Sequence, residues 1–352
     1  MIKPWIFEFL HAPSAEDGGE VPRQVATAVF DKGIALWKRL DTLGFEGIFF
    51  SEHHFGLSYS PSPNLLIAAV ARCTERLRLG TMGVVLPLYQ PWRVLEEIGM
   101  LDHLTGGRLE IGCASGVPQE LIQTGMGPDE NRDRFNESLQ ILDAWLAEPV
   151  ISHHGRYYSF DKLRIVPRPL QQPSPPKWTT VVSTASAVKS AARRSRICTA
   201  FESVARVREI FDAYRAESDR LGIACGADHL ALRRNISIAT SEAEAQERSE
   251  MARQAAIKVL AGDPRVRHQS SSLLDAPVLD APKSGNGFSV HADEFIAGTP
   301  ARVAEQIIAQ CRNSGAGHIV GILGRAVDEQ RIRAVQLFAE QVIPILRRAE
   351  IA

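Results

Sequence analysis

The chain has 352 residues, 45% of them hydrophobic and 23% charged, which is the composition of a globular protein with enough apolar side chains for a large buried core. Its formal net charge is −1, and lysine and arginine are scattered along the chain, so the sequence shows no electrostatic footprint for nucleic acid. We therefore expect a small-molecule ligand, and either two domains or one barrel.

Short runs rich in isoleucine, valine and phenylalanine alternate with longer segments of helical period, as in repeated βα units around a parallel sheet. Strands are expected near 5–9, 47–52, 77–86, 108–114, 178–183, 197–201, 230–239 and 318–323. Helices are expected at 24–43, 65–74, 93–104, 131–147, 186–194, 205–221, 301–314 and 329–348. Thr299 and Pro300 supply an N-cap and a first-turn proline for one of these helices. The pattern predicts an α/β fold, a (β/α)8 TIM barrel forming a single domain over residues 1–352.

Two stretches interrupt the alternation, at about 150–176 and 241–297. The first predicts a hairpin around Gly155 followed by a proline-rich return. The second begins with a helix at 241–260 and continues through a segment rich in Ser, Asp, Pro and Gly at 261–297. Long excursions in a barrel usually lie over its carboxyl-terminal face, so we interpret the second stretch as a mobile lid.

The five cysteines lie far apart and form no C-x-x-C pair, which disfavours a disulfide framework or a thiolate metal site. A reduced, cytoplasmic compartment fits this usage best. The N-terminal segment lacks the apolar length and cleavage pattern of a signal peptide, and no later run reaches the length of a membrane span. We therefore expect a soluble protein without a membrane partner.

Polar residues follow the second expected strand in the segment FSEHHF, which places Glu52, His53 and His54 where this fold builds active sites. Because side chains alternate in a strand, we expect only one histidine to face the centre. Histidine acts as acid, base and metal ligand alike, so catalysis and a polar cluster that caps loops or binds a metal both remain open. No H-x-H or H-E-x-x-H pattern supports a metal site, and none is predicted.

The third and fourth expected strands end in small residues. Glycines flank Met82, and such a pair indicates either a bend, the commoner case, or a backbone that a flat ligand approaches closely at Gly83. In the segment GCASG, Cys113, Ala114 and Ser115 leave room for a planar ring. Cys113 itself is typical of a small core residue rather than of a nucleophile.

Hydroxyl and guanidinium groups follow at two expected helix starts. Ser183, Thr184 and Ser186 lie between the fifth strand and the next helix, where hydroxyls and helix-start N–H groups can bind a phosphate. An N-cap role for Ser183 or Thr184 is an equally good interpretation. Arg132 and Arg134 open the fourth helix and could clamp a phosphate, although solvated surface arginines are the common case.

Several of these segments together resemble the luciferase-like family of flavin-dependent monooxygenases. The resemblance is densest from residue 44 to residue 116 and continues to residue 307, through GFEGIFFSEHHF, LRLGTMGVVLP, GGRLEIGCASG, NRDRFNESLQIL, STASAVKSAA and AGTPARVAEQI. It covers most of the chain in the right order and implies a bacterial luciferase-like barrel with insertions over its carboxyl-terminal face.

The resemblance places His53 at the position of the catalytic histidine that supports the flavin hydroperoxide in bacterial luciferase. Glu52 and His54 lie in the same motif, and with Phe7 of the first strand they are expected to contact the substrate or to support the site. The resemblance thereby favours catalysis over a metal-binding role for this segment.

The resemblance also implies a set of cofactor contacts. Met82 and Gly83 match a non-proline cis peptide beneath the isoalloxazine ring. Arg132, Ser183 and Thr184 match groups around the FMN phosphate, although Ser183 stands where bacterial luciferase has a glutamate.

The end of the fourth strand departs from bacterial luciferase. Ala114 and Ser115 keep positions beside the flavin, but luciferase has a reactive cysteine and a flavin-contacting arginine there. Light emission is therefore not implied.

The function implied is a monooxygenase that uses reduced FMN and dioxygen, through a flavin-4a-hydroperoxide, to hydroxylate, epoxidise or perform a Baeyer-Villiger insertion on a small apolar substrate. A separate NAD(P)H:flavin reductase would supply the reduced FMN, and a homodimer is expected. Aromatic residues favour an apolar pocket, although each could serve packing alone: Tyr157, Tyr158, Trp178, Phe288 and Phe295.

Three alternatives stay open from the sequence. A deazaflavin-dependent dehydrogenase shares this barrel and transfers a hydride without oxygen. A relative could bind flavin and have lost its substrate chemistry. A metal-dependent hydrolase could use the same fold, because fold alone does not determine function.

Overall fold

The computed structural model describes residues 1–11, 13, 21–55, 58–261 and 290–351. Eight parallel strands form a closed barrel, because the last strand pairs with the first. In barrel order these strands are β1 (Lys3–Glu8), β2 (Gly47–Phe50), β3 (Arg78–Thr81), β5 (Leu109–Ala114), β8 (Lys177–Thr180), β9 (Arg196–Thr199), β10 (Leu230–Ile238) and β12 (His318–Ile322). The predicted TIM barrel is confirmed.

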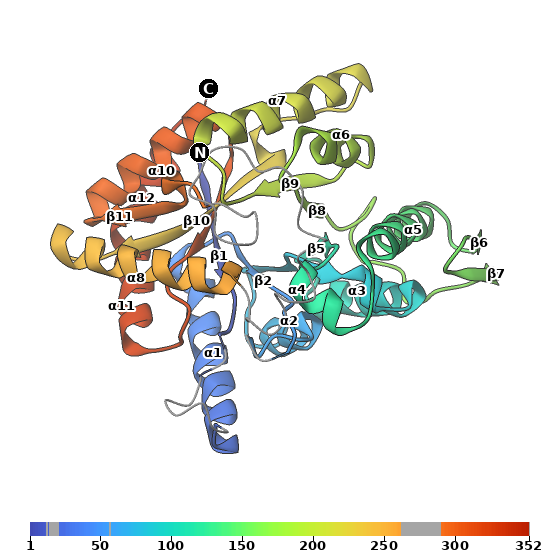
Figure 1. Ribbon diagram of the computed structural model, residues 1–352, viewed down its shortest axis with the longest axis horizontal. Helices are drawn as coiled ribbons and strands as arrows, with labels where there is room; N and C mark the ends of the chain where they lie inside the picture. The colour runs from blue at the N-terminus through green and yellow to red at the C-terminus, as the bar shows by residue number, and fades with distance from the viewer. Residues whose placement is uncertain (12, 14–20, 56–57, 262–289, 352) are drawn as a thin grey trace.

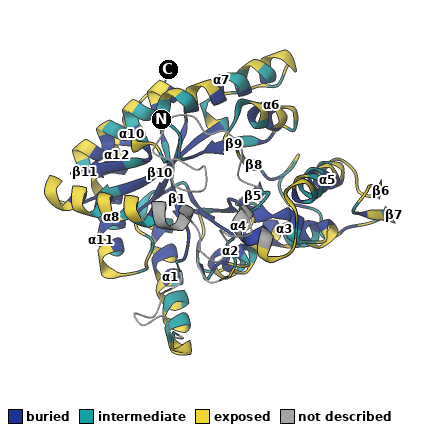
Figure 2. Ribbon diagram, in the orientation of Figure 1, coloured by how far each residue is buried: buried dark blue, intermediate teal, exposed yellow. Residues whose placement is uncertain are grey.

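Helices surround the barrel on its outside (Figure 1). They are α1 (Arg23–Leu43), α2 (Pro63–Ala71), α3 (Pro91–Leu104), α5 (Pro128–Ala147), α6 (Thr184–Ala192), α7 (Val204–Arg220), α8 (Glu242–Ala261), α10 (Pro300–Ser314), α11 (Glu329–Leu337) and α12 (Ile343–Arg348). Their outward faces are exposed while the strands are buried (Figure 2). No helix in the described ranges is long and apolar enough to cross a membrane.

Four local features differ from the expected elements. The third strand is interrupted, with β3 followed by a short β4 (Val84–Val85), and a helix α4 (Pro118–Gln123) follows β5. The last helix is divided by a π turn at Phe338–Val342. Residues expected to be irregular form β11 (Phe295–Gly298), which pairs with the carboxyl half of β10.

The predicted N-cap of α10 has the expected position but does not make the expected hydrogen bond to the helix. Pro300 is the first residue of α10 and Thr299 is its N-cap residue, as expected. The hydroxyl of Thr299, however, makes no capping bond to the helix and instead donates to Glu242 Oε1 at 2.9 Å. The carboxylate at the start of α8 competes successfully for this hydroxyl, so the bond ties α8 to the start of α10.

The two long excursions are partly described. The predicted hairpin around Gly155 is present as β6 (Ile151–His154) and β7 (Ser159–Leu163), and it lies outside α5 at the edge of the molecule (Figure 1). Glu137 of α5 anchors it by accepting the backbone N–H of Tyr158 at 2.8 Å. Most of the predicted lid lies outside the described residues, and its described ends are α8 and β11.

Large apolar side chains fill the interior of the barrel. The interior cluster consists of Trp5, Phe7, Phe9, Phe49, Met82, Trp178, Cys198, Ala231, Val320 and Ile322. Trp5 and Phe49 stack with ring centroids 4.5 Å apart, and Trp178 meets Phe49 edge-on at 5.5 Å. This packing forms a solid floor beneath any ligand at the carboxyl end.

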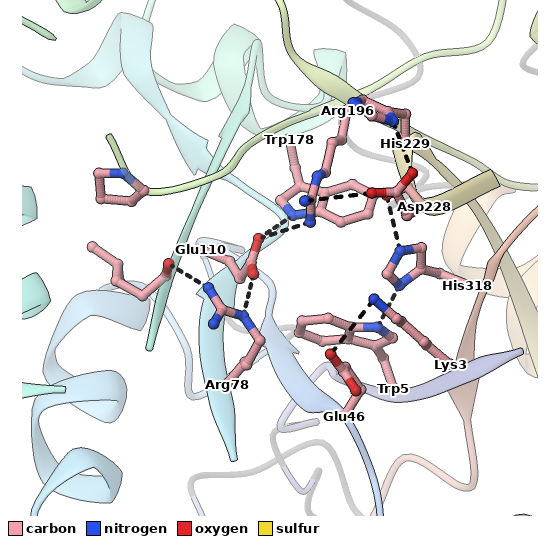
Figure 3. Close-up of polar contacts among 12 residues, drawn as sticks. Lys3, Trp5, Glu46, Arg78, Glu110, Trp178, Arg196, Asp228, His229 and His318 are labelled. Carbon is pink, nitrogen blue, oxygen red and sulfur yellow. Dashed lines mark hydrogen bonds and ion pairs between the residues drawn. The ribbon is translucent and has the colours of Figure 1, made fainter. Parts of the chain in front are cut away.

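Polar contacts close the amino end of the barrel (Figure 3). The buried Glu110 carboxylate accepts from Arg78 and, at 2.6 Å, from the indole N–H of Trp178. On the opposite side Trp5 donates its indole proton to His318 Nδ1 at 2.8 Å. Trp178 is 1% exposed. It therefore serves barrel packing rather than the pocket that its aromatic character indicated.

Glycines let β3 and β4 approach β5 closely. A Cβ on Gly112 would lie 1.7 Å from the carbonyl oxygen of Thr81, and a Cβ on Gly83 would lie 2.7 Å from the backbone of Cys113. Neighbouring backbone is the obstacle in both cases and cannot move aside as a flexible side chain could. At Gly83 the backbone that comes close is that of β5, so this glycine has a structural reason that is neither of the two interpretations, the bend and the flat ligand, drawn from the sequence.

Candidate active site

His53 lies in the loop that follows β2, at the carboxyl end of the barrel. Its Nδ1 atom is 2.9 Å from Oε1 of Glu120 on α4, and its ring packs 4.6 Å from the ring of Phe9 in the interior cluster. A carboxylate only accepts hydrogen bonds, so Nδ1 carries the proton and Nε2 is the nitrogen left to act on a ligand. The side chain is 21% exposed, which leaves it accessible.

The two neighbours of His53 face another way. Glu52 is buried and accepts hydrogen bonds from the backbone N–H of Val85 at 3.1 Å and from the hydroxyl of Tyr89 at 3.0 Å. His54 Nε2 lies 3.0 Å from the same carboxylate, and this hydrogen bond raises the pKa of His54. As predicted, one histidine faces the centre. The other joins Glu52 in holding the loop against β4.

Phe7 and Met82 belong to the floor of the site. Both are buried members of the interior cluster. The peptide bond between Met82 and Gly83 is cis, as the resemblance implies. These residues lie at the carboxyl ends of β1 and β3, so a flat ligand resting on the floor would contact them.

The end of β5 offers space. Ala114 pairs with Val85 of β4, and Ala114 and Ser115 are both only partly buried. Burial raises the pKa of the neighbouring Cys113 thiol to about 12. Cys113 is therefore an inert core residue, as predicted, and its two small neighbours are partly exposed at the end of the strand.

Ser183 and Thr184 mark the start of α6. Ser183 is its N-cap residue, and it forms a capping box with Ser186 in which each side chain binds the other's backbone N–H at 3.2 Å. The capping interpretation is therefore correct. The first turn still leaves the N–H groups of Thr184 and Ala185 without an acceptor in the helix, so a phosphate can bind beside the cap.

The two arginines of α5 have different surroundings. Arg132 is 61% exposed and its nearest carboxylate is Asp129 at 2.8 Å, so it lies on the surface with freedom to reorient. Arg134 pairs with Glu130 at 2.7 Å and lies over the ring of Tyr157 at 4.7 Å. Arg134 therefore holds the β6–β7 hairpin, and only Arg132 stays available for a phosphate.

Two of the remaining aromatic candidates belong to the β6–β7 hairpin rather than to the site. Tyr157 and Tyr158 pack the hairpin against α5. Phe295 is the first residue of β11 and is partly buried, and Phe288 lies outside the described residues. Sequence alone did not distinguish side chains that support the frame from those that line a pocket.

Other residues at the carboxyl end were not singled out from the sequence. Glu120 and Tyr89 bind His53 and Glu52. Arg233, in the middle of β10, pairs with Glu294 just before β11, and Arg325 follows the end of β12. Of these residues, only Arg325 could have been found from the sequence, because it comes shortly after an expected barrel strand, where this fold builds its active sites. In the ranges that the structure describes, no three His, Cys, Asp or Glu side chains form a metal-binding group.

Comparison with known proteins agrees with this geometry. The family model described as luciferase-like monooxygenase matches residues 9–318. An uncharacterised protein of Sinorhizobium fredii, y4wF, is 32% identical over 87% of this chain and 86% of its own. The oxygenase component of flavin-dependent trigonelline monooxygenase from Acinetobacter baylyi is 33% identical over 48% of this chain and 47% of its own.

A solved structure supports the same assignment of the fold. The oxygenating constituent of 3,6-diketocamphane monooxygenase from Pseudomonas putida, a type II Baeyer-Villiger monooxygenase in complex with FMN, superposes with a TM-score of 0.75. It is 20% identical, and the match covers 97% of this chain and 98% of that one. Because the family model spans most of the chain, the protein belongs to the luciferase-like family of flavin-dependent monooxygenases.

Proposed function

We propose that the protein is the oxygenase component of a two-component system that uses reduced FMN and dioxygen to oxygenate a small organic substrate with an apolar body. The observation that carries this proposal is the position of His53 above a sealed aromatic floor, held at Nδ1 by Glu120. Family membership supports the flavin chemistry. A flavin rather than a deazaflavin is supported by the name of the trigonelline relative, a flavin-dependent monooxygenase.

The described residues fit FMN. Met82 and Gly83 would lie under the ring system, with the small Ala114 and Ser115 at its edge. The phosphate would bind the first turn of α6 through Thr184 and the adjacent Ser183, where hydroxyl and N–H donors suit an anion. Arg132, at the start of α5, would supply the counter-charge. When bound, reduced FMN would supply the electrons for oxygen activation.

His53 acts through Nε2, opposite the nitrogen that Glu120 holds: this nitrogen accepts a proton or a hydrogen bond in the neutral ring, and it donates the proton back once the ring has become the imidazolium. Glu120 keeps the ring in one orientation, and Phe9 limits its movement on one face. The solid floor prevents water from entering through the barrel, and exclusion of water protects reactive species from hydrolysis. Proton transfer of this kind contributes about a hundredfold or more to a rate.

The partners follow from this chemistry. A separate NAD(P)H:flavin reductase would supply reduced FMN, as the name of the trigonelline relative, an oxygenase component, supports. A homodimer is supported by exposed apolar side chains on the packed helices α2 and α3, with Leu65 71% and Met100 50% exposed. If α2 and α3 form the dimer interface, the Leu65→Glu variant should have the molar mass of a monomer in light scattering.

All five cysteines are free, which supports a reducing, cytoplasmic compartment.

Mass spectrometry with labelled dioxygen tests the proposal. The protein is incubated with chemically reduced FMN and a panel of small organic compounds, and the products are examined for the oxygen label. Wild type is expected to transfer one labelled atom, and His53→Ala is expected to lose most of that transfer. Reaction with a reduced deazaflavin but not with reduced FMN would contradict the choice of cofactor. Tight FMN binding without label transfer to any compound would indicate a non-catalytic flavin-binding protein.

A further inference from the structure

Three guanidinium groups gather near one carboxylate on the side of the barrel formed by β10 and β12. Arg233 points into the barrel and its Nη2 atom lies 2.9 Å from Oε1 of Glu294, while Arg234 on the other face of β10 lies 3.3 Å from Oε2. All three side chains are buried, and Arg233 is 7% exposed. One carboxylate is thus shared by two guanidinium groups, and the Arg233 Nη2 atom lacks hydrogen-bond geometry to any described residue.

Arg325, just beyond the end of β12, adds a third guanidinium. Its Nε atom is buried, and among the described residues it has no hydrogen-bond partner. Burial, and then the nearby charge of Arg233, lower the pKa of Arg325 to about 10, so the group is still charged at neutral pH. A buried N–H donor without an acceptor is costly, and a bound anion would remove that cost.

A cavity of about 240 Å³ lies beside Arg325, between the ends of β10 and β12 and the helices α8 and α11. Its apolar lining includes Ile238, Ile322 and Leu323, which suits the body of a small organic molecule. In Figure 1 this region lies on the other side of the barrel from α6. Barrels of this fold often bind anions after their seventh and eighth strands, the positions of β10 and β12.

The other charged groups of the cavity already have partners. Arg331 makes two bonds to Glu8, at 3.0 and 2.8 Å. Arg248 donates to a backbone carbonyl at 2.9 Å and to Glu244. Asp328 is exposed, and its Oδ1 atom caps α11 by accepting the N–H of Arg331 at 2.8 Å. Among the described residues that line this cavity, Arg325 is therefore the cation that a ligand can still bind.

One aromatic ring joins Arg325 to the proposed catalytic group. The Arg325 guanidinium lies 5.2 Å from the ring centroid of Phe9, and the ring of His53 lies 4.6 Å from that of Phe9. An anion bound at Arg325 would thus lie about one ring away from His53. The reacting atom of a small acid can then reach His53 while its anionic end stays at Arg325.

We propose that the substrate is a small organic carboxylate, with its carboxylate on Arg325 and its apolar body extending from the cavity beside Arg325 past Phe9 towards His53. This inference rests on the proposed function and adds the chemical class of the substrate. The planar guanidinium matches a carboxylate in two parallel hydrogen bonds. The phosphate of FMN is the other possible source of an anion, but its expected donors lie at α6, across the barrel.

Ligand-induced thermal stabilisation of the full chain tests this inference, because a ligand that binds the native state raises Tm. The probes are acetate, butyrate, benzoate and phenylacetate, each compared with its primary amide. Wild type is expected to bind at least one acid roughly tenfold or more tightly than its amide, since hydrogen bonds to charged groups are the stronger ones. Arg325→Gln should abolish this preference. Arg325→Lys should keep a weaker one.

Arg253→Gln is the matched control, because Arg253 lies on α8 near the same cavity but is exposed and paired with Glu250. It should behave as wild type. Equal binding of acids and amides by wild type would overturn the inference, and so would an acid preference that survives in Arg325→Gln. If Arg325→Gln does not fold, the inference is still tested by wild type and Arg325→Lys. Wild type should prefer the acid to its amide, and Arg325→Lys should show a weaker preference.

Titration with oxidised FMN separates the two sources of an anion. Arg325→Gln should bind FMN as tightly as wild type, whereas a weakening of roughly tenfold would assign Arg325 to the FMN phosphate and overturn the inference. The labelled-dioxygen experiment separates this inference from the proposed function. Label transfer to neutral compounds only would contradict the carboxylate substrate and leave the monooxygenase intact. Acid binding at Arg325 without any label transfer would contradict the proposed function.

Discussion

His53 and Glu120 are 67 positions apart in the chain, yet Nδ1 of the histidine lies 2.9 Å from Oε1 of the glutamate. Glu120 is 6% exposed, so this hydrogen bond is shielded from water. A shielded bond to a carboxylate fixes both the orientation and the tautomer of an imidazole. Glu120 is therefore a positioning residue for His53.

Glu120→Gln should lower the oxygenation rate by about tenfold, because a neutral amide replaces the charged acceptor of a buried hydrogen bond. His53→Ala should lower it by about a hundredfold or more. Oxygenated product and the reoxidation rate of bound reduced FMN are the measurements. FMN affinity should not change in either variant, and Glu305→Gln, an exposed change on α10, should match wild type. Loss of FMN binding in Glu120→Gln would indicate a structural role instead.

The close approach of β5 to β3 makes a second prediction. Gly112→Ala should destabilise the protein by about 3 kcal/mol or more, because the new Cβ would lie 1.7 Å from the carbonyl oxygen of Thr81. Gly127→Ala is the control, since a Cβ there meets nothing within 4 Å. Urea unfolding monitored by tryptophan fluorescence measures both. Similar midpoints for the two variants would show that the barrel can relax around Gly112.

Much of the barrel could be predicted from the sequence, because strands buried on both faces give continuous apolar runs that alternate with helical stripes. β11 could not be predicted, because four residues between a low-complexity stretch and a proline carry too little pattern. The glycines that flank Met82 indicated a bend in the third strand but not a break. The close contact of Gly83 with the backbone of β5, which shows why the strand stops, belongs to the folded chain.

Glu294 makes a third prediction, because it is completely buried between Arg233 and Arg234. Glu294→Gln should cost about 3 to 5 kcal/mol of unfolding free energy, since both guanidinium groups would lose the carboxylate that compensates their burial. Denaturant unfolding at neutral pH is the measurement. Glu305→Gln, on the exposed face of α10, should change stability by about 0.5 kcal/mol or less. A small effect at Glu294 would mean that another anion or water neutralises the pair.

The candidate site could be predicted only where position in a strand determines role. His53 follows a barrel strand, and that placement alone indicated the carboxyl end. Its partner Glu120 lies in α4, a six-residue helix without a clear apolar stripe, and no spacing rule links the two. Arg325 follows a strand too, but sequence cannot show that its neighbours leave it without a carboxylate. Pairing and burial are properties of the folded chain.

His318 makes a prediction about pH. It is buried at the amino end of the barrel, where Nδ1 accepts the indole proton of Trp5 at 2.8 Å and Nε2 donates to the carbonyl of Asp228 at 3.0 Å. Both nitrogens are satisfied in the neutral ring, and a second proton would displace the indole. Burial, followed by the charges of Lys3 and Arg196, lowers the pKa of His318 to about 3.

The folded pKa of His318 thus lies below its unfolded value of 6.5, so between pH 6.5 and about 3 the unfolded chain binds the proton and the folded chain does not. Stability from this residue is complete above pH 6.5 and falls by about 1.4 kcal/mol for each unit below it. His318→Gln can still accept and donate but cannot titrate. Urea unfolding at pH 7 and pH 5 should therefore show a larger loss for wild type than for the variant. Equal losses would mean that other groups determine the acid sensitivity.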